Sequence, residues 1–402
     1  MDWQPFRVPP RRWSPRLSPL WVNIWRPLRR LLRVKVKGVL EVEVRGVEYL
    51  KGPVEAKCGV LITPNHAAHA DPFVVYEAAD ELRRPFYFLA AWQVFGRLGM
   101  LERIMLQWHG CFSVDREGTD MQAFRQAVSI LQESVNPLVI FPEGEVYHIN
   151  DRATPFREGP AVIAMTAAKR ANRPIVCVPC AIKYTYVQDP TPKLVELMGR
   201  LEERILWRPR PEVPLAERIY RFAEAALALK EQEYLGHTQQ GSLPERISSL
   251  SHKVLEGLEG RYEIRPSAET QPPERVKTLR KEVIERIEAA DEDSEQGRQS
   301  RLDLDDLFFV AQLFSYPGDY VAGKPSIERM AETLDKFEED VLRAPTATIR
   351  GARRAVVSFG EPIEVHHNRD RKTAAHTLTE TLEDRVQTLL DAIEPTERSD
   401  FS

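Results

Sequence analysis

The chain has 402 residues, of which 43% are hydrophobic, and a formal net charge of -4. This composition excludes a disordered protein, and the length indicates two domains or one domain with a large insertion. Residues 1–50 hold eleven Lys and Arg against four Asp and Glu, a net charge of +7, which leaves -11 for the remaining 352 residues. The four cysteines predict no disulfide framework, and no second CxxC pair joins Cys177 and Cys180 to complete a zinc site.

The N-terminal segment, residues 1–38, interleaves Trp3, Trp13, Trp21 and Trp25 with arginines that include Arg26, Arg29, Arg30 and Arg33. Tryptophan favours the headgroup depth of a bilayer and arginine attracts anionic lipid, so the pattern predicts a membrane-surface segment. A helix docked on the protein's own core is the alternative. We find neither the ~20 apolar residues of a spanning helix nor a signal-peptide layout. Nucleic acid is disfavoured as a partner, because the body of the chain is acidic.

Residues 39–190 alternate short β-branched or aromatic runs with helix-patterned segments. This alternation predicts an α/β domain with a mixed central sheet flanked by helices. We expect strands at Leu40 to Val44, Gly59 to Thr63, Phe86 to Ala90, Cys111 to Val114, Leu138 to Phe141 and Ile175 to Tyr184. We expect helices at Pro72 to Leu82, Trp92 to Gln107, Thr119 to Glu133 and Gly159 to Ala171.

Residues 191–351 are rich in charge and lack strand patterns. Helical spacing is clear in Leu215 to Leu235 and Glu274 to Ala290, and two Pro-rich breaks, one of them Arg208-Pro209-Arg210-Pro211, interrupt the region. A strand at Ala355 to Gly360 and a helix at Thr373 to Ile393 then return within residues 352–395. We therefore expect a large helical insertion before the last strand of the α/β domain. The acidic run Ala290 to Glu295 indicates an exposed linker.

The first chemical motif follows the apolar run Leu61 to Pro64, where Asn65-His66 is followed by Asp71. Imidazole titrates near neutrality and can take a proton from an alcohol, while a neighbouring carboxylate fixes its tautomer. The pair therefore predicts group transfer to a hydroxyl. Alternatively, Asp71 is only a helix N-cap before Pro72, and the histidine is a loop residue like His69.

Two further predicted strands end in polar groups. Arg116, after Gly110 to Val114, presents a planar fork suited to phosphate, with Asp115 placed to steady it. Glu143-Gly144, after Phe141-Pro142, offers a carboxylate for substrate hydroxyls and a glycine that allows close backbone approach. Read singly, the first segment is better explained as a surface turn with an ordinary salt bridge, and the second as a Pro-Gly turn with an exposed glutamate.

In order and spacing, these segments resemble the PlsC-like glycerophospholipid acyltransferase family, which includes the 1-acylglycerol-3-phosphate O-acyltransferases. The resemblance covers about residues 35 to 190 and rests on Asn65-His66 with Asp71, Gly110-x-Phe112-x-x-Asp115-Arg116, Phe141-Pro142-Glu143-Gly144, and Pro174 with Val178-Pro179. Four ordered blocks are far more specific than any one of them.

The resemblance implies transfer of a fatty acyl group from acyl-CoA or acyl carrier protein to a hydroxyl of a glycerophosphate or lysophospholipid, without cofactor, metal or acyl-enzyme. It implies that His66 is the base and that Asp71 orients it. Asn65, Gly110, Arg116, Glu143 and Gly144 would bind the acceptor, with Arg116 on its phosphate. The implied setting is peripheral, at the cytoplasmic face of a membrane whose lipids are the partners.

Two features depart from the family pattern. Tyr147 stands where the third block usually continues to a serine or threonine, and the helical block is unusually long. The first leaves open an acyltransferase that acts on a lipid hydroxyl other than a glycerophosphate. The second leaves open a catalytically silent membrane-bound scaffold, although the intact set of His66, Asp71, Arg116 and Glu143 argues against it.

Overall fold

The computed structural model describes residues 12–116, 120–266, 272–291, 294–366 and 371–394. The chain packs into an α/β unit, within Pro9–Pro190 and Thr348–Ser402, and a helical unit, Thr191–Ala347. Trp3 and two residues of the linker expected at Ala290 to Glu295 lie outside the described residues. The two units are described separately below.

One sheet forms the centre of the α/β unit. Its strands are β1 (Val39–Arg45), β2 (Gly59–Pro64), β3 (Tyr87–Ala91), β4 (Cys111–Val114), β5 (Leu138–Val139), β6 (Ile175–Tyr186), β7 (Arg353–Phe359) and β8 (Ile363–Glu364). Their spatial order is β1-β7-β6-β2-β5-β3-β4, and β8 lies beside β6. Only the pairs of β6 with β7 and β8 are antiparallel, so the predicted mixed sheet is confirmed.

The helices of this unit are α1 (Pro19–Ile24), α2 (Arg26–Lys35), α3 (Glu48–Glu55), α4 (Asp71–Leu82), α5 (Trp92–Gly96), α6 (Met100–Trp108), α7 (Met121–Glu133), α8 (Gly159–Arg170) and α15 (Arg371–Asp391). The single helix predicted from Trp92 to Gln107 is wrong. It breaks before Gly99, the N-cap of α6, whose N–H donates to the Glu102 carboxylate at 2.8 Å.

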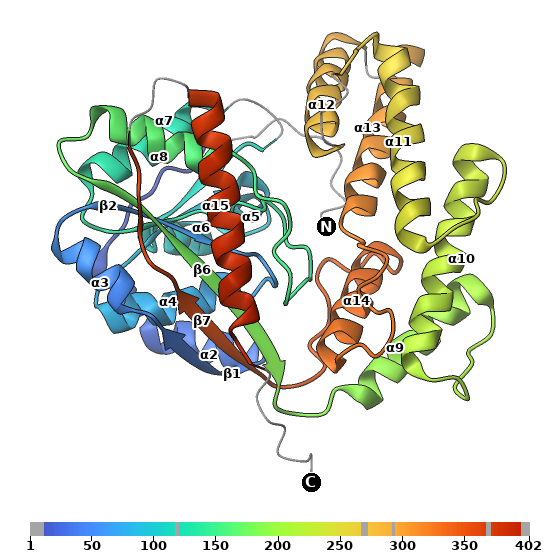
Figure 1. The fold of residues 1–402 in the computed structure, drawn as a ribbon, viewed down its shortest axis with the longest axis horizontal. Helices are drawn as coiled ribbons and strands as arrows, with labels where there is room; N and C mark the ends of the chain where they lie inside the picture. Colours follow the sequence, from blue (N-terminus) through green and yellow to red (C-terminus); the bar gives the residue numbers. More distant parts are fainter. Residues whose placement is uncertain (1–11, 117–119, 267–271, 292–293, 367–370, 395–402) are drawn as a thin grey trace. The chain divides into compact units, whose positions relative to one another are not determined.

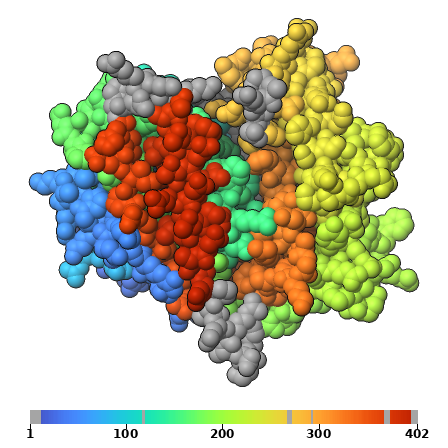
Figure 2. Space-filling model, in the orientation of Figure 1, coloured from blue at the N-terminus to red at the C-terminus, as the bar shows by residue number. Residues whose placement is uncertain are grey.

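Helices cover both faces of the sheet, because its strands are apolar on both sides. Along β2, Val60 and Ile62 point into one core with α3, α4 and α5, and Leu61 points into the other with α7, α8 and α15. Figure 1 shows α15 crossing the front of the sheet along β6, and Figure 2 shows it as the outer layer of that face. Cys177 and Cys180 lie in opposite cores.

The helical unit consists of α9 (Thr191–Leu206), α10 (Leu215–Leu235), α11 (Leu243–Tyr262), α12 (Pro272–Ala289), α13 (Glu295–Phe314) and α14 (Ile327–Asp340). Its core includes Leu255, Leu279 and Leu307, from three different helices. Paired charges also join successive helices: Glu202 to Arg218, Glu231 to Arg246 and Glu259 to Arg275. These bidentate pairs explain part of the high charge content of this region.

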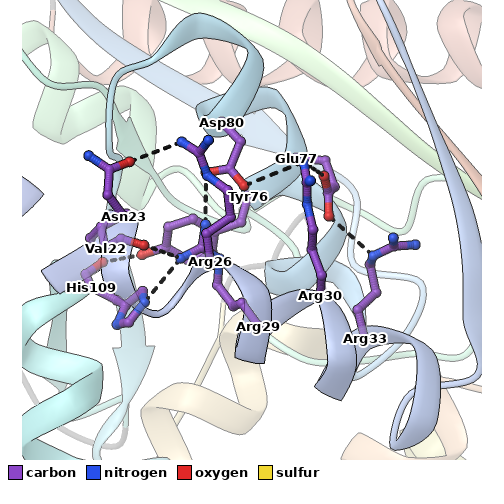
Figure 3. A network of polar contacts seen from close by, with 10 residues as sticks. All are labelled: Val22, Asn23, Arg26, Arg29, Arg30, Arg33, Tyr76, Glu77, Asp80 and His109. Carbon is purple, nitrogen blue, oxygen red and sulfur yellow. Dashed lines mark hydrogen bonds and ion pairs between the residues drawn. The ribbon is translucent and has the colours of Figure 1, made fainter.

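The described part of the basic N-terminal segment docks on the protein's own core. On α2, Arg29 donates to Asp80 of α4 at 2.8 Å, and Arg33 approaches Glu77 of α4 at 3.2 Å (Figure 3). Arg29 also donates to Nε2 of His109, a ring that burial and the nearby Arg29 charge keep neutral by lowering its pKa. The four arginines of α2 therefore have carboxylate partners within the chain.

Two tryptophans of this segment stack on other aromatic rings of the α/β unit. Trp13 stacks on Phe95 with ring centroids 5.2 Å apart, and Trp21 stacks on Trp108 at 4.6 Å. Residues 12–38 thus make the contacts that the alternative of docking on the core expects, while Leu20, Ile24 and Leu31 stay exposed. The membrane-surface segment stays a prediction. None of the described helices has both the length and the apolar character needed to cross a bilayer.

Arg29→Met tests this docking. The substitution keeps much of the packing volume but removes the main partner of the buried Asp80, so the free energy of unfolding should fall by about 2–3 kcal/mol. We expect less than the ~3–5 kcal/mol of a fully orphaned charge, because Arg26 also reaches Asp80, at 3.1 Å.

The matched control is Arg30→Met, one position along α2, where the arginine side chain is 52% exposed. It should change the free energy of unfolding by less than ~1 kcal/mol in the same urea titration. Equal effects of the two substitutions would contradict an anchoring role for Arg29.

Candidate active site

The polar segments singled out in the sequence meet at one edge of the sheet. β2, β5, β3 and β4 are adjacent and parallel, so their carboxyl ends lie at the same edge. His66 follows β2, Glu143 follows β5 and Arg116 follows β4. The topology thus brings together groups that are 27 to 77 residues apart in the chain.

The centre of this edge is a hydrogen-bonded pair. Nδ1 of His66 lies 2.7 Å from Oδ2 of Asp71. The same oxygen accepts the backbone N–H of Ala68 at 3.0 Å, and Oδ1 accepts the Tyr184 hydroxyl at 2.6 Å. With Nδ1 committed to the carboxylate, Nε2 is the ring nitrogen that can take a proton from a substrate.

Asp71 does not cap α4. It is the first residue of that helix, Ala70 is the N-cap, and no side chain caps the helix. The Asp71 carboxylate is fully buried and turns back into the preceding loop. The alternative that Asp71 serves only as an N-cap is therefore wrong, and the carboxylate selects His66 rather than His69.

Tyr184 is a site residue that the sequence analysis missed. It lies in β6 and points, like Ile182, to the face that α4 covers. Burial raises the pKa of its hydroxyl far above the ordinary value, and Asp71 adds to the effect, so the group stays a donor. The sequence did contain a sign of this role, because a tyrosine in an apolar strand must find a hydrogen-bond partner for its buried hydroxyl.

The imidazole is also held by its flanking groups. The ring of Phe141 stacks on His66, with centroids 4.1 Å apart and planes inclined by 23°. Asn65 is fully buried and exchanges two hydrogen bonds with the backbone of Ile182 in β6, at 2.7 and 3.0 Å. Asn65 thus fixes the backbone at the end of β2, and its amide is occupied by protein groups.

Glu143 is buried behind the pair, 2% exposed. Burial raises the pKa of its carboxyl to about 8, and hydrogen bonds from Thr154 and the backbone N–H of His66 only partly offset this effect. The charge of Asp71 raises it further. Near neutral pH the raised pKa favours the protonated form of Glu143, and this buried carboxyl group supports the His66 loop.

Arg116 reaches the same turn from β4. Its Nη1 donates to the carbonyl of Gly144 at 2.5 Å and pairs with Glu145 at 2.6 Å. Burial acts to raise the pKa of the Glu145 carboxyl, but Arg116 and Arg157 outweigh it and hold that pKa below its ordinary value. Two guanidinium groups thus flank this end of the site, with one carboxylate between them.

Two glycines differ in where they lie. Gly144 has φ +80° in the turn itself, and an added Cβ would lie 2.7 Å from Nε of Arg157. Gly110 also has a positive φ but precedes β4, at the opposite edge of the sheet, where an added Cβ would meet the carbonyl oxygen of Phe86 at 2.6 Å. Gly110 therefore serves the turn between α6 and β4.

Glu143→Gln tests the neutral state of Glu143. A carboxyl whose pKa is raised on folding stabilises the fold below its ordinary pKa of 4.5, and this contribution is lost as pH rises toward about 8. Between these values, wild type should lose stability relative to Glu143→Gln by up to about 1.4 kcal/mol per pH unit. Denaturant titrations of both proteins at several pH values measure the difference; a difference independent of pH would show that Glu143 is ionised throughout.

Comparison with known proteins places this edge of the sheet within a family match. Residues 41–183 match the family model described as Acyltransferase. No curated protein matches the chain. The matched region contains His66, Asp71, Arg116 and Glu143 and stops one residue before Tyr184. Residues 41–183 therefore form a domain of the acyltransferase family, the family of the PlsC-like acyltransferases.

Proposed function

We propose that this protein transfers a fatty acyl group from acyl-CoA or acyl carrier protein to a hydroxyl of a glycerophosphate or lysophospholipid. The observation that carries the proposal is the hydrogen bond between Nδ1 of His66 and the buried Asp71 carboxylate, at 2.7 Å, inside an acyltransferase-family domain. The substrates, a lysophospholipid and a long acyl chain, both partition into bilayers, so we propose that the reaction takes place at a membrane surface.

In the proposed mechanism, Nε2 of His66 takes the proton from the acceptor hydroxyl as its oxygen attacks the thioester carbonyl. The C–O bond forms and the C–S bond breaks, and the imidazolium returns the proton to the leaving thiolate. Asp71 holds the ring in the tautomer that leaves Nε2 unprotonated and stabilises the imidazolium. Tyr184 and the N–H of Ala68 keep this carboxylate in place.

The acceptor would lie on the turn after β5. A phosphate group on the acceptor suits the planar guanidinium of Arg116, and Arg157 is a second cation for it. Glu145 lies between them and would have to give up part of its pairing with Arg116 when a phosphate binds. The protonated form of Glu143 avoids a further negative charge behind the site.

The Glu145 carboxylate favours a second candidate function. Glu145 already pairs with Arg116, and the buried Tyr147 follows where the family has a small hydroxyl residue. A lipid alcohol without phosphate would leave that pair intact. We therefore propose, as the alternative, an acyltransferase of the same mechanism that acts on an unphosphorylated lipid hydroxyl.

His66→Ala tests the base. Positioned general-base catalysis contributes about 100- to 10,000-fold, so acyl transfer should fall by that factor. The melting temperature should fall somewhat, because the buried Asp71 carboxylate loses one of its three hydrogen-bond partners, so activity is compared well below the melting temperature of the variant. His69→Ala, in the same loop, is the matched control and should stay within a few-fold of wild type. Thioester consumption and ester formation are measured together; retained turnover in His66→Ala would mean that the base is elsewhere.

Arg116→Gln separates the two acceptors. Charged hydrogen bonds to phosphate are worth about 1.5–3 kcal/mol, so KM for a phosphorylated acceptor should rise about 10- to 100-fold, while kcat changes little. For an unphosphorylated acceptor, both constants should stay close to those of wild type. Equal losses with both acceptors would rule out the phosphate role and favour the alternative function. Glu145→Gln should lower KM for the phosphorylated acceptor alone.

A further inference from the structure

Figure 1 shows the connection between α9 and α10 in the helical unit. This connection carries an exposed aromatic residue among arginines. Trp207, directly after α9, is 91% exposed, and Leu206 beside it is 38% exposed. Arg204, Arg208 and Arg210 are also exposed. Residues 204–211 contain three arginines and no carboxylate, between Glu203 and Glu212.

The backbone makes this exposure notable. Trp207 has φ +63°, the left-handed conformation that usually suits a glycine at the end of a helix. A bulky side chain is sterically disfavoured there. A tryptophan that gains no burial in the fold and occupies a strained position has no role within this unit that explains it.

Next to Trp207 lies a hollow of about 360 Å³ with a positive lining. Arg208, Arg210, Arg218 and Arg221 line it together with Glu202. Glu202 binds Arg218, and Glu217, outside the lining, binds Arg221. The hollow thus keeps an excess of positive charge after these pairs are counted, which suits a phosphate headgroup.

We propose that residues 204–210 form a lipid-docking turn: Trp207 enters the headgroup layer of an anionic membrane, and the arginine-lined hollow binds a lipid phosphate. Tryptophan favours that depth, and each arginine near an anionic surface adds attraction. The inference does not rest on the proposed acyl transfer. The His66→Ala variant should therefore bind lipid like wild type even though it has lost acyl transfer.

Vesicle co-sedimentation of the full chain tests the proposal. Wild type should bind vesicles of equimolar phosphatidylcholine and phosphatidylglycerol, and bind phosphatidylcholine vesicles far more weakly. Arg208→Gln with Arg210→Gln should weaken binding about 30-fold, about 5-fold per arginine. Trp207→Gly should weaken it at least about tenfold, from lost apolar burial. Its melting temperature should not fall, because glycine relieves the left-handed strain.

The matched charge control is Lys253→Gln with Lys277→Gln, exposed on α11 and α12 and equal in charge change. It should bind within about threefold of wild type, since screening confines the attraction to charges near the surface. Wild-type binding by both turn variants would overturn the proposal. So would binding of inorganic phosphate, lost in the double arginine variant, without any binding to anionic vesicles.

Discussion

The buried carboxylate of Asp71 is the constraint on which the candidate site depends. It is fully buried and accepts hydrogen bonds from three places in the chain: His66 after β2, Ala68 in the loop before α4, and Tyr184 in β6. A buried carboxylate is costly unless such donors satisfy it. The hydrogen bonds that satisfy the buried Asp71 carboxylate therefore also fix the orientation of the His66 ring. The geometry that stabilises the fold here is the same geometry that the proposed base needs.

The sheet supplies the rest of the arrangement. Parallel neighbours end at one edge, so the turn after β5 supports the His66 loop through Glu143 and faces Arg116 through Gly144 and Glu145. Burial raises the pKa of Glu143 to about 8, so this carboxyl group adds little negative charge beside Asp71 at neutral pH. Arg116 pairs with Glu145 at the same turn, so in the proposed function a phosphate on the acceptor would have to compete with this pair.

Much of the fold follows from local pattern. The predicted strands correspond to β1 to β7 within a few residues, and the chain order of His66, Arg116 and Glu143 at strand ends placed the site. The sequence pattern could not predict the contacts between residues far apart in the chain. Tyr184 joins Asp71 from 113 residues away, and Asp80 neutralises Arg29 from a helix that sequence spacing does not connect to it. Segment composition alone therefore did not show that the arginines of α2 pair with carboxylates of α4, and the membrane-surface assignment of residues 1–38 stays a prediction.

The central claim is that Asp71 holds His66 with Nδ1 protonated and Nε2 free to accept a proton. Nitrogen NMR of ¹⁵N-histidine-labelled protein, with His66→Gln to assign the signal, measures this tautomer directly above the usual titration range of imidazole. We predict an Nδ1–H signal for His66 at such pH, lost in Asp71→Asn. A ring protonated at Nε2, or a tautomer unchanged by Asp71→Asn, would contradict the account.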